Sequence, residues 1–144
     1  MRIVALLLGA LLLARPAAAQ EAAPVPMLSI AIGEKVTVRI APEGRFVELS
    51  RASGTARADQ PARNTVSFSF FEAEGLRGMM NSNGSRDILS YRIRAFAGDR
   101  EVDNDVCLAV PGFASVQIWN ERVDRVELSE PRAVREGESL PQCD

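Results

Sequence analysis

The stretch Thr65–Phe71, with the sequence TVSFSFF, decides the fold class of this chain. Its apolar side chains at Val66, Phe68 and Phe70 alternate with serines. Because successive side chains of an extended strand point to opposite faces, this alternation predicts a strand with one buried face and one polar face. Valine and phenylalanine are also enriched in strands. The stretch therefore indicates a β-rich fold.

Similar runs recur along the chain, separated by turn residues at intervals of about eight to twelve residues. No segment of ten or more residues has a convincing helical period. This spacing predicts an all-β fold, an antiparallel β-sandwich (immunoglobulin-like or similar) of about seven to nine strands, with a barrel as the alternative. Further strands are expected from residue 27 onward at Lys35–Ile40, Arg45–Ser50, Ile88–Ala97, Val106–Val110, Phe113–Trp119 and Val123–Leu128, with a short apolar piece at Leu76–Met80.

The connections between these runs carry their own signals. Ala41–Gly44, Gly98-Asp99 and Pro111-Gly112 are rich in turn residues. The Asn-Gly pair within Asn81–Ser85 predicts a hairpin turn. The polar stretch Ser50–Asn64 predicts a loop of about fifteen residues, a length typical of functional or mobile loops. The residues expected in the core and at its rim are Phe68, Phe70, Tyr91, Ile93, Val116, Ile118 and Trp119.

The N-terminus has the pattern of a secretory signal peptide at residues 1–19. A positive start is followed by the apolar run Ile3–Leu13 and by Ala17-Ala18-Ala19, so cleavage is expected before Gln20. Residues 20–26 are expected to be a flexible leader, and residues 27–144 a single domain. No later apolar stretch reaches 18 residues, so no membrane span is expected after cleavage. The predicted location is periplasmic or secreted.

The two cysteines of this exported chain, Cys107 and Cys143, are expected to form a disulfide. The bridge would close a loop of about 37 residues, which the chain-entropy model credits with about 4 kcal/mol. It would tie the C-terminal tail back to the domain. Free thiols or an intermolecular bridge are the alternatives.

The residue inventory excludes most catalytic mechanisms. The chain has no histidine and a single lysine, Lys35, and its cysteines are expected to be bridged. We therefore expect no enzymatic activity and no cofactor. The remaining catalytic option is a carboxylate-dependent hydrolase at Glu72 and Glu74 or at Asp103 and Asp105, which needs a cleft that joins two acids.

Charged side chains suggest two further kinds of site. Glu101, Asp103 and Asp105 alternate and would share one face of a regular strand, which makes them candidate calcium ligands, with a solvated edge as the alternative. No other metal site is expected. Arg92 and Arg94 also share a strand face and are candidates for an anion-binding patch near Arg77 or Arg86, with salt bridges to neighbouring strands as the alternative.

Three aromatic residues are candidates for binding a sugar ring. Trp119, Phe113 and Tyr91 would serve as a platform if they were exposed, and burial of Trp119 would argue against this role.

The segment from Tyr91-Arg92 through Asp105-Val106-Cys107 and Trp119 to Val123 and Leu128-Ser129 resembles small secreted proteins of Gram-negative bacteria. The resemblance covers about forty residues and rests on the spacing around one cysteine and one tryptophan. It implies an exported β domain and carries no activity.

Taken together, these features favour an exported, non-enzymatic β-sandwich that binds a protein or an envelope component. A carbohydrate-recognition module is the alternative, and the carboxylate-dependent hydrolase is the second alternative. The formal net charge is −2, so neither nucleic acid nor an anionic membrane is an expected partner.

Overall fold

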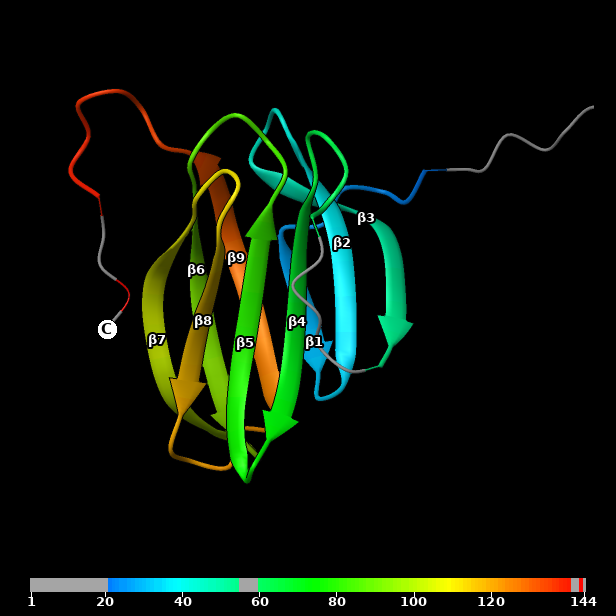
Figure 1. Cartoon of the computed structure of the whole chain (residues 1–144), viewed down its shortest axis with the longest axis vertical. Coiled ribbons are helices and arrows are strands. Elements are labelled where there is room, and N and C mark those ends of the chain that lie inside the picture. Colours follow the sequence, from blue (N-terminus) through cyan, green and yellow to red (C-terminus); the bar gives the residue numbers. More distant parts are fainter. Residues whose placement is uncertain (1–20, 55–59, 141–142, 144) are drawn as a thin grey trace, which may run out of the picture.

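The computed structural model describes residues 21–54, 60–140 and 143. The expected signal peptide and residues 55–59 of the expected long loop lie outside this set. The described residues form nine strands (Figure 1), and none of them belongs to a helix that could cross a membrane. The strands are β1 (Met27–Ala31), β2 (Glu34–Ala41), β3 (Arg45–Ser53), β4 (Val66–Ala73), β5 (Leu76–Asn83), β6 (Leu89–Ala97), β7 (Arg100–Ala109), β8 (Ala114–Trp119) and β9 (Arg125–Ala133).

The strands form two packed sheets, which confirms the antiparallel β-sandwich. One sheet has the order β1-β9-β6-β7 and the other the order β3-β2-β4-β5-β8. All strand pairs within the sheets are antiparallel. The sandwich therefore has two flanks, one where β1 and β3 are the edge strands and one where β7 and β8 are (Figure 1).

Aromatic side chains meet in the core. Phe68 of β4 and Tyr91 of β6 pack edge to face between the sheets with ring centroids 5.1 Å apart, and Phe70 packs in the same way on Trp119 of its own sheet at 6.1 Å. Trp119 is buried, and so are Phe68, Phe70, Tyr91 and Ile93, as the alternation in β4 and β6 predicts. Burial of each large side chain contributes roughly 2–3 kcal/mol relative to leaving it in water.

Two residues expected in the core, Val116 and Ile118, are half exposed instead, at 50% and 54%. The reason lies in the period of two along β8. Trp119, which pairs with Arg77, faces the interior. The neighbouring Ile118 must then face outward, and so must Val116 two residues before it. The inward positions of β8 are held by Trp119 and by polar side chains.

The Asn-Gly pair at Asn83-Gly84 does not form the predicted hairpin turn. β5 runs through Asn83, and the hairpin turn between β4 and β5 lies at Glu74-Gly75, where both residues have positive φ. The side chain of Asn83 is buried, and its Nδ2 donates to the carbonyls of Asp87 and Ala109. Its Oδ1 accepts from the Ser85 N–H, a local contact typical of asparagine in turns, whereas the contact with Ala109 of β7 depends on the tertiary structure.

The expected long loop begins later than predicted, because β3 continues to Ser53 and pairs with β2 as far as Glu34. Residues 49–53 of β3 are exposed on both faces. A strand with two solvated faces has no alternation of apolar residues, so its polar sequence resembles that of a loop.

Two other strands are longer than the apolar runs that predicted them. β7 begins at Arg100, before the apolar run, and β9 continues past Leu128 through Pro131. The register of β9 against β6 shifts at Glu130, which has positive φ, and β1 pairs with β9 only up to Ser129. Beyond Ser129, the β1 side of β9 has no partner strand, so no backbone N–H is needed there. A proline, which lacks the amide hydrogen, is therefore tolerated at this bulge.

The residues before β1 are also tied to the fold. Val25, within the expected leader, exchanges two backbone hydrogen bonds with Phe46 of β3 and packs against the core. The ordered chain therefore begins before Met27.

Candidate functional site

The disulfide between Cys107 and Cys143 confirms the predicted pairing. Cys107 is buried on the inner face of β7, and Cys143 belongs to the C-terminal segment that follows β9. The bridge therefore holds this segment against the flank formed by β7 and β8. A disulfide is compatible with an oxidising compartment outside the cytosol.

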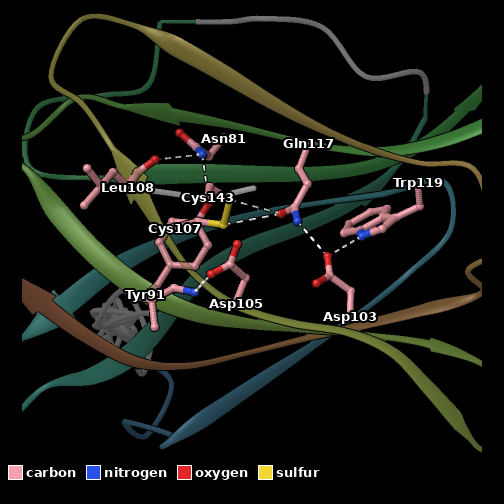
Figure 2. The surroundings of a disulfide bond; sticks show 10 residues. Asn81, Tyr91, Asp103, Asp105, Cys107, Leu108, Gln117, Trp119 and Cys143 are labelled. Carbon is pink, nitrogen blue, oxygen red and sulfur yellow. Dashed lines mark hydrogen bonds between the residues drawn. A yellow bond between two sulfur atoms is a disulfide. The ribbon is translucent and has the colours of Figure 1, made fainter. Parts of the chain in front are cut away.

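Polar side chains join β7 to β8 beside the disulfide (Figure 2). Asp103 Oδ2 accepts hydrogen bonds from Gln117 Nε2 at 2.7 Å and from the indole Nε1 of Trp119 at 2.6 Å. Gln117 Oε1 lies 3.4 Å from both sulfur atoms. Because disulfide sulfurs carry no proton, these are contacts rather than hydrogen bonds. Asp103 of β7 thus accepts hydrogen bonds from two side chains of β8, in the opposite sheet.

A second polar group lies deeper, between the sheets. Asn81 Nδ2 donates to the hydroxyl oxygen of Tyr91 and to the carbonyl of Leu108. Asn81 Oδ1 is buried and has no hydrogen-bond partner among the described residues. Burial raises the pKa of Tyr91 well above its usual value, and the hydrogen bond from Asn81 opposes this rise. A groove of about 380 Å³ reaches this group, lined among others by Met79, Asn81, Tyr91, Gln117 and Cys143.

The three candidate aromatic platforms differ in exposure. Trp119 is 7% exposed and Tyr91 is 3% exposed, so neither can stack on a ligand. Phe113 is 69% exposed at the end of the loop between β7 and β8. Only one of the three predicted aromatic residues is therefore placed for contact with a ligand.

The three candidate calcium ligands do not share a face. Opposite β7, Phe96 pairs with Glu101 and Ala95 pairs with Asp103, so Val102 is an extra residue that forms a bulge. The bulge turns Glu101 outward, where it binds Arg94, while Asp103 binds Trp119 on the other face. The carboxylates of the three candidate residues therefore do not converge on one point where they could bind a calcium ion.

Asp105 lies with the two sulfur atoms in a tight cluster. Its Oδ1 accepts a hydrogen bond from the backbone N–H of Val106. The cysteines are consumed by the disulfide and cannot bind a metal as thiolates. This cluster offers a metal ion one carboxylate, which is too few ligands for a stable site.

The two acid pairs proposed for hydrolysis are also placed unfavourably. Glu72 forms an ion pair with Arg77, and Glu74 occupies the exposed turn between β4 and β5. Asp103 is engaged by Trp119 and Gln117. None of these acids is among the described residues that line the three clefts of about 510, 380 and 350 Å³.

Arg92 and Arg94 do share the outer face of β6, but each is already paired. Arg92 binds Glu130 of β9, and Arg94 binds Glu101 of β7 and Glu127 of β9. The guanidinium of Arg94 also lies over the Phe96 ring. Arg77 is buried in the other sheet, where it donates to the carbonyl of Val123. The arginines therefore form cross-strand salt bridges, the alternative given by the sequence.

The four edge strands differ in how they are protected. β3 and β7 carry several charged side chains, which discourage pairing with another chain. β1 is uncharged, but its Ser29 carbonyl accepts from Arg51, and its Ala31 N–H donates to Glu34. β8 has the uncharged sequence ASVQIW and pairs only with β5.

The outward residues of β8 form the feature that sequence analysis missed. Val116 and Ile118 are half exposed on an uncharged edge strand. The period of two would have placed them outside once Trp119 was assigned to the core. No comparable signal marks Asn81 or Gln117, whose partners lie on other strands.

Comparison with known protein families, with curated proteins and with solved structures finds no match for this chain.

Proposed function

We propose that this chain is an exported, non-enzymatic β-sandwich that binds a protein of the cell envelope along its edge strand β8. One observation carries the proposal: β8 is an uncharged edge strand that presents Val116 and Ile118 to solvent at half exposure. Strand addition supplies backbone hydrogen bonds for affinity, and alternate side chains supply specificity. The partner would contribute an extended segment with apolar residues at every second position.

The other three edges support this choice by contrast. Charged side chains protect β3 and β7, and Arg51 with Glu34 occupies backbone groups of β1. Long apolar edges tend to aggregate, so proteins normally block them. An uncharged, apolar edge is expected where pairing with a partner is the function.

Export is supported by the signal pattern at residues 1–19 and by the disulfide. The absence of histidine from the sequence and the engagement of Asp103 and Glu72 support a non-enzymatic role. A binding function does not require the carboxylates of Asp103 and Glu72 to be free of hydrogen bonds and ion pairs.

Site-specific crosslinking in the envelope of cells that export the chain tests the proposal. A photoreactive residue at position 116 should give one defined protein adduct. The same residue at position 49 is the matched control, because Leu49 is an apolar, 45%-exposed residue on the charged edge strand β3. Ile118→Lys should reduce the adduct at position 116 at least tenfold without lowering Tm, because the side chain is in solvent.

Equal labelling at positions 49 and 116, or no adduct at position 116, would contradict the proposal. Persistence of the adduct in the Ile118→Lys variant would show that β8 is not the contact. Leu49→Lys, the companion variant, should leave the adduct unchanged.

A further inference from the structure

A second cleft lies at one end of the sandwich rather than along its edge. The segment before β4, the connection from β5 to β6 and the loop between β7 and β8 meet at this end (Figure 1). They enclose a cleft of about 510 Å³, lined among others by Gln60, Arg63, Ser85 and Phe113. This volume lies in the range of small-molecule sites.

The floor of the cleft is fixed by close packing at Gly84. A Cβ at this position would lie 2.4 Å from the Ala62 carbonyl oxygen and 2.7 Å from that of Pro61, so only glycine fits beneath the segment. Gly84 also exchanges backbone hydrogen bonds with Asn64 and Thr65. The segment that carries Arg63 is therefore packed on the residue that directly follows β5.

Phe113 is exposed on a loop that is itself held in place. Gly112 N–H donates to the Asn83 carbonyl, Phe113 N–H donates to the Val110 carbonyl, and Pro111 forms a bridge with Asn83. Exposure of a phenylalanine forgoes roughly 2 kcal/mol of burial. A fixed backbone that presents this ring at the mouth of a cleft is suited to stacking on a ligand.

Arg63 is the one charged side chain among the described residues that line the cleft. Arg63 lines it and forms no ion pair within the part of the chain that the structure describes. No carboxylate is among its described lining residues. Asp87, in the connection from β5 to β6, lines a different cleft of about 350 Å³. A guanidinium that is not engaged by an acid is available to bind a carboxylate with two parallel hydrogen bonds.

We propose that this cleft binds an acidic saccharide, a sugar ring that carries a carboxylate. The apolar face of the ring would stack on Phe113, and the carboxylate would bind Arg63. The amide of Gln60 and the hydroxyl of Ser85 supply donors and acceptors for the ring hydroxyls. The polar lining favours such a ligand over an apolar molecule, which would leave these groups without partners.

Calorimetric titration of the oxidised protein with trigalacturonate tests the proposal, with the methyl ester of the same trisaccharide as a neutral control. We expect trigalacturonate to bind at least tenfold more tightly than the ester. Phe113→Ala should weaken both ligands at least tenfold. Arg63→Gln should remove the preference for the acid. Arg92→Gln, on the outer face of the other sheet, is the matched control and should change neither affinity.

Several results would overturn the proposal. These are no binding of trigalacturonate, or of glucuronate and mannuronate oligomers, at millimolar concentration; equal affinity for acid and ester; or affinities that survive both cleft variants. Tighter binding of a peptide through its C-terminal carboxylate would assign the cleft to a protein ligand instead. Both substituted residues are exposed, so each variant should keep the Tm of the parent chain.

Discussion

The two flanks of the sandwich are closed by different chemistry. At the flank of β1 and β3, Val25 exchanges backbone hydrogen bonds with Phe46, and Arg51 of β3 donates to the Ser29 carbonyl of β1. At the flank of β7 and β8, the hydrogen bonds of Asp103 join the two edge strands, and the disulfide ties the C-terminal segment to β7 beside them. One flank is closed by backbone contacts and an exposed arginine, and the other by partly buried side-chain hydrogen bonds.

This difference explains why β8 can remain uncharged. Where Arg51 closes the flank, the same charged side chain also protects the edge from pairing with other chains. Where Asp103 closes the flank, the contacts lie on the inner faces, and the outer face of β8 is left to Val116 and Ile118. The flank closed by partly buried hydrogen bonds is therefore the one with an uncharged, apolar edge strand.

Removal of the disulfide is the largest expected perturbation. The double variant Cys107→Ala with Cys143→Ala should lose about 4 kcal/mol of unfolding free energy, because the unfolded chain regains the freedom of a loop of about 37 residues. Tm should fall by roughly 10–20 °C. Urea unfolding of the variant against the oxidised parent chain measures this effect, and the reduced parent chain should show the same loss. A loss below 1 kcal/mol would show that the covalent bond adds little to the stability of the fold.

Removal of the Asp103 carboxylate should have the next largest effect. Asp103→Ala leaves the Trp119 indole and the Gln117 amide without their acceptor, and hydrogen bonds to a charged group are worth about 1.5–3 kcal/mol. Asn104→Ala, the neighbouring residue on the outer face, is the control and should cost less than about 0.5 kcal/mol. Urea unfolding and the Trp119 fluorescence spectrum report both changes. If the two variants lost the same free energy of unfolding, Asp103 would not be a stabilising link between β7 and β8.

At the opposite flank, the ion pairs of Arg51 should contribute less to the free energy of unfolding, and their contribution should depend on pH. Arg51→Ala is expected to cost about 1 kcal/mol at neutral pH, because the pairs are partly solvated and screened. The hydrogen bond from Arg51 holds the pKa of Glu48 below its usual value. A folded-state pKa below the unfolded one gives stability that is present above the unfolded pKa and lost as pH falls through the folded pKa.

The difference between Arg51→Ala and the parent chain should therefore shrink as pH falls below about 4. Urea unfolding at a series of pH values measures it, with Arg39→Ala, an exposed arginine paired to Glu21, as the control. A difference that stays constant with pH would show that Arg51 acts through packing alone.

The smallest effect is expected where the C-terminal segment leaves β9. The hydrogen bond from Arg132 lowers the pKa of Glu138 to about 2, helped by the backbone N–H of Arg135. NMR titration of the Glu138 carboxyl should show this low value, and Arg132→Gln should return it toward the ordinary range. A Glu138 pKa in the ordinary range in the parent chain would show that Glu138 does not bind Arg132.

The sequence determined the fold class and the covalent bond. Alternation in Val66, Phe68 and Phe70 predicted β4 with its buried face, because the period of a strand is a local property. The pairing of Cys107 with Cys143 followed because the chain has two cysteines and a pattern typical of export. Phe113 was proposed as a ligand contact, and the structure leaves its ring in solvent.

Only the tertiary structure decided which side chains meet. The bulge at Val102 separates Glu101 from Asp103, and bulges depend on the partner strand rather than on local sequence. Asn83 ends β5 instead of forming a hairpin turn, and its Nδ2 donates to the Ala109 carbonyl of β7, a contact between segments far apart in the chain. The edge position of β8 likewise follows from the order of strands in the sheet, and that order is set by packing between segments far apart in the chain.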